Sequence, residues 1–210
     1  QRDVSQTTST SRTTTRDRVL WRSAEDDSEE NSSDHNQNPD PLAQTFIIQE
    51  EGGCFLTKID AFFGAKDKNL PVWCEIRNVV NGYPGPKILP FGRKILEPAD
   101  VNVDENTAGT ATTFTFDSPV YVQEGTEYCV VFLTHSLDYR MWISQLGELD
   151  VSGTNRAISR QPHIGVLFKS SNNRTWTPVQ AQDLKFKLYK AKFSTTDGTC
   201  TLVNDNIGNF

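Results

Sequence analysis

Oxygen-bearing side chains at alternate positions are the first feature of this sequence that could do chemistry. They lie within residues 99–109 and are Asp100, Asn102 and Asp104. Hard oxygen ligands at this spacing can bind Ca²⁺. An EF-hand loop would have glycine where Glu105 stands, however, and a chelating acid at its twelfth position, which is missing. The alternative is the solvated edge of a strand, with Val101 and Val103 pointing inward, so the segment is a weak calcium candidate.

Aromatic side chains give a second candidate site, because exposed rings on a sheet surface can stack against sugars. The candidates for glycan binding are Tyr139, Arg140 and Trp142. Trp73 is a further candidate, since it shares a strand face with Glu75 and Arg77, and that alternation predicts partial exposure. The alternative is that these rings belong to the core or its rim, where large aromatic side chains dominate burial.

The stretch SSNNRTWTP, residues 170–178, resembles the Asp-box turn of sialidases and other β-folds, Ser-x-Asp-x-Gly-x-x-Trp. It departs from that pattern in three ways: Asn173 replaces the acid, the spacing is one residue short, and only one copy exists. The Asp-box is a structural turn, so the segment predicts a β-hairpin turn and not a catalytic device.

Residue patterns typical of enzymes are missing from the sequence. His35, His135 and His163 are isolated, and there is no GxSxG, HExxH or phosphate-binding loop. We therefore expect that the protein is not an enzyme and that it uses no cofactor.

The cysteines are Cys54, Cys74, Cys129 and Cys200, and none of them forms a CxxC pair or a metal-binding spacing. The first three lie in apolar runs, where a reduced cysteine behaves as a small hydrophobic side chain. A small secreted domain with a disulfide framework would have more cysteines. The sequence therefore predicts reduced cysteines in the core.

Composition divides the chain into three parts: an extended or disordered N-terminal arm (1–41), a folded domain (42–193) and a C-terminal tail or linker (194–210). The net charge is −6, and residues 1–40 contribute −4 of it, from five arginines and nine acids. No basic face is indicated, which argues against nucleic-acid binding. No apolar run approaches the roughly 18 residues of a membrane helix, so we expect no membrane association.

The arm contains one apolar island, in the stretch DRVLWRS. Its residues are Val19, Leu20 and Trp21. The rest of the arm lacks the apolar content that would offset its ordering entropy. We expect the island to be an anchor that binds a partner or a neighbouring subunit, the alternative being chance.

The folded part has the pattern of an all-β protein, with about nine or ten strands separated by Gly, Pro, Asn and Asp and no helical period. This predicts an antiparallel β-sandwich, jelly-roll-like. Strands are expected within 42–48, 52–65, 71–80, 111–122, 124–134, 139–145, 163–170 and 183–193. A loop is expected at 81–86, and a short helical turn near 89–96 or 98–101.

Side-chain alternation predicts which faces of these strands are buried. Phe55, Ile59 and Phe63 share one parity and predict one buried face. Phe114 and Phe116 alternate with threonines, and the run 124–134 is apolar throughout, which is typical of a strand buried on both faces.

Two stretches carry a resemblance to structural proteins of contractile-tailed bacteriophages, particularly those of cyanobacteria. The matching residues in the first are Asp40 to Phe46, Gly53, Phe55, Leu56, Asp60, Phe63, Leu70, Pro71, Val72 and Ile76 to Pro84. The second, residues 164–193, looks like the final strands of the same module, and its Trp-then-DLxFxLY ending is similar to that of many extracellular jelly-roll domains.

The resemblance covers about residues 40–193. It implies a non-catalytic virion component of a tail, baseplate or fibre, assembled in the host cytoplasm as a homo- or hetero-oligomer with other virion proteins. The alternative is a receptor- or glycan-binding module of a tail fibre or decoration protein, which would recognise a glycan of the host surface.

Overall fold

The computed structural model describes residues 18–20, 41–151, 156–159 and 165–193, with the backbone alone for residues 18–20. These ranges contain thirteen strands and one short 3-10 helix, η1. The elements are β1 (Arg18–Leu20), β2 (Leu42–Ile47), β3 (Cys54–Ala61), β4 (Phe63–Ala65), β5 (Val72–Val80), β6 (Tyr83–Leu96), η1 (Pro98–Asp100), β7 (Thr112–Val122), β8 (Glu127–Thr134), β9 (Arg140–Gln145), β10 (Leu167–Lys169), β11 (Thr177–Val179), β12 (Gln182–Leu184) and β13 (Phe186–Lys190). No helix in the described part is long and apolar enough to cross a membrane.

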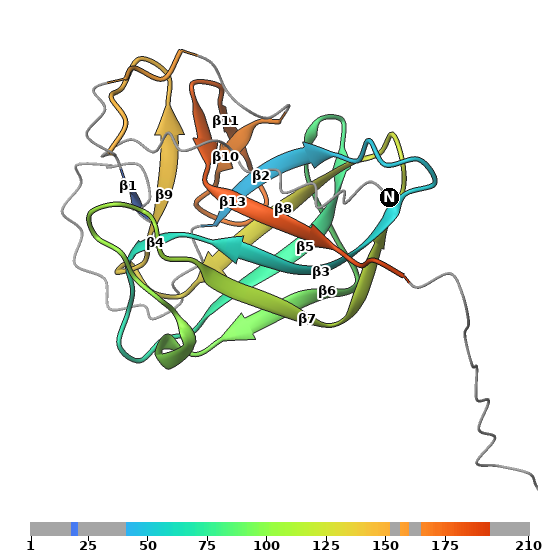
Figure 1. The fold of residues 1–210 in the computed structure, drawn as a ribbon, viewed down its shortest axis with the longest axis horizontal. Helices are drawn as coiled ribbons and strands as arrows, with labels where there is room; N and C mark the ends of the chain where they lie inside the picture. Colours follow the sequence, from blue (N-terminus) through green and yellow to red (C-terminus); the bar gives the residue numbers. More distant parts are fainter. Residues whose placement is uncertain (1–17, 21–40, 152–155, 160–164, 194–210) are drawn as a thin grey trace, which may run out of the picture.

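The strands form three antiparallel sheets. The largest has the order β11-β10-β2-β8-β5-β6, a second has the order β13-β3-β7, and the third has the order β1-β9-β12 with β4 also paired to β9. Figure 1 shows β3, β7 and β13 lying over the sheet that contains β2, β5, β6 and β8. Strands that are consecutive in the chain often belong to different sheets, as in a jelly roll. The predicted all-β antiparallel sandwich is confirmed.

The main core lies between the layers and is rich in phenylalanine. Phe114 of β7 contacts Phe132 of β8, with ring centroids 5.7 Å apart, and Phe46 of β2 lies 6.5 Å from Phe186 of β13. All four side chains are buried. Full burial of a side chain of this size contributes about 1.5–3 kcal/mol, so these contacts hold the layers together.

A second apolar cluster covers the outer face of the six-stranded sheet. Its members are Ala43, Trp73, Cys129, Val131, Leu133, Phe168 and Trp176. The predicted partial exposure of Trp73 is therefore wrong: its side chain is only 8% exposed, and Glu75 and Arg77 on the same face are 3% and 5% exposed. The reason is tertiary, because β10 and the turn before β11 supply Phe168 and Trp176 as cover. The prediction that β8 is buried on both faces is confirmed.

A β-bulge changes the face of β3. The register shifts between Leu56 and Lys58, so Leu56 and Ile59 are both buried while Phe55 is 38% exposed. The extra residue of a bulge reverses the side-chain alternation on one side of it. The prediction that Phe55 shares a buried face with Ile59 and Phe63 is therefore wrong for Phe55 alone.

The expected loop at 81–86 is shorter than predicted. Asn81 and Gly82 form the turn, with φ of 53° and 81°, and β6 begins at Tyr83. Pro84 and Pro86 lie within β6, which is the edge strand of its sheet. Proline has no backbone N–H to donate, and an edge strand tolerates this because one of its sides has no partner strand. η1 confirms the expected short helical turn and places it at the second of the two positions named for it, whereas residues 89–96 belong to β6.

Three of the four cysteines are described, and all three are free thiols. Cys74 and Cys129 are buried, and burial raises the pKa of Cys74 above its usual range and that of Cys129 to about 12. The prediction of reduced cysteines in the core is confirmed for Cys74 and Cys129, whereas Cys54 is a free thiol that is only partly buried, and Cys200 lies outside the described part.

Candidate functional site

The calcium candidate is an Asx-type turn closed by its own backbone. Asp104 accepts hydrogen bonds at Oδ1 from the amides of Asn106 (3.0 Å) and Thr107 (2.9 Å), and at Oδ2 from the amide of Gly109 (2.8 Å). The Thr107 hydroxyl also donates to Oδ2, and these bonds, led by that of Thr107, hold the pKa of Asp104 well below its usual range. Asn102 donates its amide to the carbonyl of Ala111.

A cation at this turn would have to displace those donors from the Asp104 carboxylate. Asp100 lies in η1, and the described residues contain no group of three His, Cys, Asp or Glu side chains that could hold a metal. Both carboxylate oxygens of Asp104 are thus used to close its own loop, and the arrangement does not support a calcium site.

The glycan candidates lie at the start of β9, and their rings are inside the protein. Tyr139 is 0% exposed and Trp142 is 2% exposed, while Arg140 is half-buried. The Tyr139 hydroxyl donates to the carbonyl of Leu70 (2.7 Å), and the Trp142 indole donates to that of Asp104 (2.8 Å). The prediction that these rings form an exposed stacking platform is wrong. Both rings pack inside the protein, and their polar atoms donate hydrogen bonds to backbone carbonyls of loops.

The segment that resembles an Asp-box is a hairpin turn between β10 and β11. Asn172 accepts hydrogen bonds at Oδ1 from the amides of Arg174 (2.9 Å) and Thr175 (2.7 Å), and Asn173 has φ of 57°. The antiparallel pairing of β10 with β11 and the burial of Trp176 complete the hairpin. The prediction of a structural turn is confirmed.

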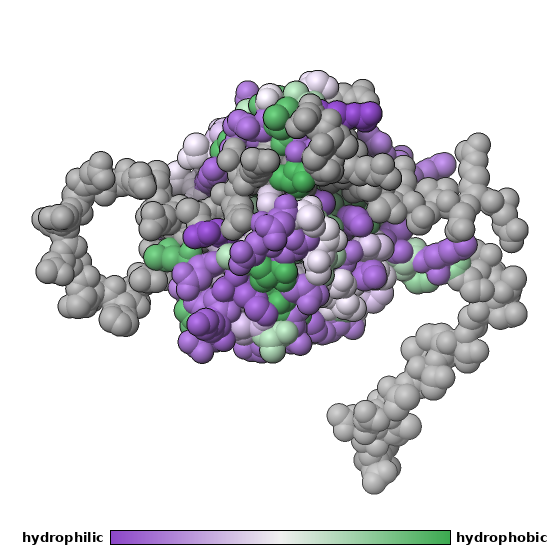
Figure 2. Space-filling model, turned by 60° about the vertical axis from the view of Figure 1, so that its left-hand side comes forward, coloured by the Kyte–Doolittle hydropathy of each residue, from purple (hydrophilic) through white to green (hydrophobic). Residues whose placement is uncertain are grey.

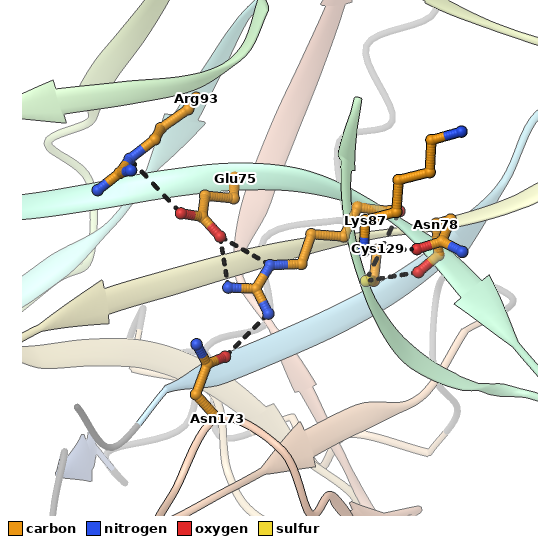
Figure 3. Close-up of polar contacts among 7 residues, drawn as sticks. Glu75, Asn78, Lys87, Arg93, Cys129 and Asn173 are labelled. Carbon is orange, nitrogen blue, oxygen red and sulfur yellow. Dashed lines mark hydrogen bonds and ion pairs between the residues drawn. The ribbon is translucent and has the colours of Figure 1, made fainter. Parts of the chain in front are cut away.

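A buried ion pair joins this turn to the six-stranded sheet (Figure 3). Arg77 donates through Nε to Glu75 Oε2 at 2.7 Å, and a second guanidinium nitrogen pairs with the same carboxylate. The third guanidinium nitrogen donates to Asn173 Oδ1 at 2.8 Å. Arg93 lies 3.5 Å from Glu75 Oε1 and over the ring of Trp73, 5.6 Å from its centroid. We call Glu75, Arg77, Arg93 and Asn173 the outer-face network.

The buried members of the outer-face network, Glu75 and Arg77, are paired within the protein and therefore act in folding. Each of the three guanidinium nitrogens of Arg77 bonds within the protein, and the side chain is only 6% exposed, so it is turned away from solvent. The bond from Arg77 to Asn173 also fixes the hairpin turn over the second apolar cluster, since Asn173 belongs to that turn. Nearby, Cys129 Sγ lies 3.7 Å from the Arg77 carbonyl, and Asn78 accepts from the amide of Lys87 (Figure 3).

Three exposed aromatic side chains form a group on the sheet β13-β3-β7, which we call the aromatic patch. Phe55 lies at the centre, with ring centroids 5.1 Å from Tyr121 and 5.3 Å from Phe193. The three are 38%, 49% and 62% exposed. An ion pair between Lys190 and Glu50, with Nζ and Oε2 2.6 Å apart, lies on neighbouring chain segments.

The backbone around the aromatic patch is well ordered by hydrogen bonds. The amide of Ala191 donates to the carbonyl of Phe55 at 2.7 Å, which fixes the chain that leads to Phe193. The Tyr121 hydroxyl donates to the carbonyl of Gly52 at 3.3 Å. The patch is thus a set of rings held in place, and sequence reasoning missed it because the bulge in β3 moved Phe55 out of the core.

Other exposed apolar residues lie along β6, where Tyr83, Ile88, Phe91 and Ile95 are each more than a third exposed, and in loops, as Leu137 does. On the face that Figure 2 shows, hydrophilic residues predominate and hydrophobic residues form small separate groups. Singly scattered apolar residues are normal on protein surfaces, and the aromatic patch differs from them in that its exposed rings are contiguous.

The apolar island of the arm is partly described. The backbone of Val19 and Leu20 belongs to β1, which pairs with β9, and Trp21 lies outside the described residues. That Trp21 contacts a partner stays a prediction.

Asp183 of β12 is a buried acid with one oxygen that has no hydrogen-bond partner in the described structure. Oδ1 accepts from Gln44 Nε2 at 3.2 Å, while Oδ2 has no donor. Gln44 Oε1 in turn accepts from the amide of Leu184 at 2.9 Å. Burial raises the pKa of Asp183 to about 6, and the bond from Gln44 opposes that shift.

Comparison with protein-family models gives no match for this chain, and comparison with curated proteins gives none either. The resemblance to phage structural proteins therefore depends on the sequence motifs alone.

Replacing Arg77 by methionine tests the outer-face network. The change leaves the Glu75 carboxylate buried with only Arg93 near it, so we expect the free energy of unfolding to fall by about 3–5 kcal/mol. Arg93→Met is the matched control, because the Arg93 side chain is 50% exposed and its contribution should stay below about 1 kcal/mol. Urea unfolding of both variants measures the difference, and equal losses would contradict a special role for the buried pair.

Asp183 predicts a stability that depends on pH in an unusual direction. Its pKa is higher in the folded state than the usual 3.8, so the folded protein binds the proton more tightly than the unfolded chain does. The contribution of Asp183 to stability should therefore fall as the pH rises from about 4 to about 6 and stay low above that.

The isosteric substitution Asp183→Asn should remove this dependence and raise the free energy of unfolding at pH 7.5 by about 1–3 kcal/mol. Chemical unfolding of both proteins at a series of pH values between 4 and 8 checks it. A difference between the two proteins that does not change with pH would show that Asp183 does not titrate in this range.

Proposed function

We propose that this chain is a structural virion protein of a phage tail or baseplate, which assembles through its arm and the surface of its β-sandwich. The aromatic patch is the observation that carries the proposal. It exposes three rings in mutual contact on an ordered sheet, and aromatic residues are the ones enriched at the energetic centres of protein interfaces. The sequence motifs of residues 40–193 support the phage context.

The bonding partners of the buried and loop-closing polar side chains support the same proposal. Asp104 closes a loop, Arg77 and Glu75 hold a hairpin turn, and Asp183 bonds Gln44. Each of these groups is directed at the protein itself, and none forms a constellation aimed at a small substrate. Assembly by surface contact requires no such constellation.

Glycan binding, the alternative, has less support. The rings chosen for it, Tyr139 and Trp142, are buried. In the aromatic patch, Phe55 packs at 52° to Tyr121 and at 87° to Phe193, so these rings lie at angles to one another and form no flat platform.

The phage context can be tested on particles. Antibodies against residues 42–193 should label gradient-purified virions of the virus that encodes the chain, and mass spectrometry should find the chain in them at fixed stoichiometry. Infectious particles without the chain would overturn the proposal. An array of host-surface glycans probed with the same protein would test the alternative.

The aromatic patch can be tested by a paired substitution, Phe55→Ser with Tyr121→Ser. We expect association with the neighbouring virion protein or with further copies of the chain to weaken at least tenfold, because the anchoring rings are lost. Phe91→Ser on β6 is the control, since Phe91 is 63% exposed and lies outside the patch. Sedimentation velocity measures the association, and an equal effect of both changes would exclude the patch as the contact.

A further inference from the structure

Strand β9 has two edges, and they are covered in different ways. On one edge, the Trp142 amide donates to the Phe62 carbonyl at 2.9 Å, and the Lys185 amide donates to the Trp142 carbonyl at 3.0 Å. That edge is therefore occupied by the segments of β4 and β12, which belong to the folded domain. The other edge is covered by β1, a segment of only three residues.

The register of β1 on β9 is defined by the antiparallel pairing. Val19 lies opposite Met141, with Arg18 opposite Trp142 and Leu20 opposite Arg140. Figure 1 shows β1 beside β9, at the side of the molecule where β4 also lies. The N-terminal arm thus contributes a strand to the sheet of a domain from which it is separated in the sequence.

The outer edge of β9 requires such a cover. Met141, Trp142 and Ile143 are at most 2% exposed, so β9 is an apolar strand. The edge of an apolar strand is a template for pairing with another strand, and backbone groups left without partners there are costly. Whatever strand covers this edge is held by main-chain hydrogen bonds.

The covering strand can come from another copy of the chain. Residues 21–41 separate β1 from β2, and 21 residues of extended chain span up to about 70 Å. A folded domain of about 150 residues has a radius of gyration of about 15 Å. The connection is therefore long enough for β1 to reach the β9 edge of an adjacent domain.

We propose that the outer edge of β9 is a docking surface for β1 and that copies of this chain exchange β1 strands when they assemble. This deepens the proposed function, because it names the surface and the partner through which the arm would act. β1 makes the same hydrogen bonds whether it pairs with β9 of its own chain or with β9 of another copy. The equilibrium between the two states therefore depends on the entropy of closing the chain on itself and on the entropy of association, and a high local concentration favours exchange.

The direction of the backbone groups identifies the residue of β1 that matters. Successive residues of a strand direct their backbone groups to opposite edges. Since the groups of Trp142 face β4 and β12, those of Met141 face β1, and its opposite residue Val19 pairs with it. Leu20 directs its amide away from β9.

Proline substitutions in the full chain separate these two positions. Val19→Pro removes the donor that pairs with β9, whereas Leu20→Pro removes an amide that faces away and favours extended geometry at Val19. We expect the wild-type chain and Leu20→Pro to form a multimer as concentration rises, and Val19→Pro to need at least tenfold higher concentration. Size-exclusion chromatography with light scattering measures this, and circular dichroism checks that each variant is folded.

A peptide of residues 12–24 with a fluorescent label provides the second measurement. The Val19→Pro chain should bind it, because its β9 edge is vacated, and should bind the same peptide carrying Val19→Pro at least tenfold more weakly. Equal binding of both peptides, or none, would overturn docking at β9. A chain that remains monomeric at all concentrations would overturn exchange between copies.

The outcomes also separate this inference from the proposed function. A multimer that the Val19→Pro chain forms as readily as the wild type would overturn strand exchange, while assembly through the aromatic patch would stand. A multimer that is lost in Val19→Pro and kept in Phe55→Ser with Tyr121→Ser would support exchange at β9 and count against the patch.

Discussion

The burial of β8 on both of its faces is the constraint on which this fold depends. Seven of its eight residues are buried, and six of these are divided equally between the main core and the second apolar cluster. A strand without a face toward water needs cover from two layers. One layer is the sheet of β3, β7 and β13, and the other is the hairpin turn that precedes β11.

The second cover consists of one hairpin turn, and a buried ion pair holds that turn in place. A single turn brings Trp176 over the sheet, and Asn173 of that turn adopts a left-handed backbone conformation that asparagine tolerates better than most residues. The buried guanidinium of Arg77 connects Asn173 to Glu75. Burying this pair carries a desolvation cost, and the bond from Arg77 to Asn173 ties the turn to the sheet.

Local alternation was enough to predict some elements and not others. The threonine and phenylalanine pattern of β7 and the apolar run of β8 determine their own burial, and the structure agrees with both. The bulge in β3 has no sequence signal of this kind, so Phe55 was assigned to the core. The cover over Trp73 comes from residues about 100 positions later, and a strand-by-strand pattern contains no information about it. The same limit applies to the candidate sites, because the burial of Tyr139 and Trp142 is a tertiary property.

These findings move the search for function from side-chain chemistry to surfaces. The residues that could have bound a metal or a sugar close a turn or fill the core, as Asp104 and Trp142 show. Two surface features remain: the outer edge of β9, which the three-residue strand β1 covers, and the exposed aromatic patch. Both recognise other polypeptides by general means, the edge through main-chain hydrogen bonds and the rings through buried area. An edge specifies register and direction, whereas a ring patch contributes most of its energy without fixing either. Under the proposed function, the two together would give a neighbouring subunit both affinity and a defined orientation.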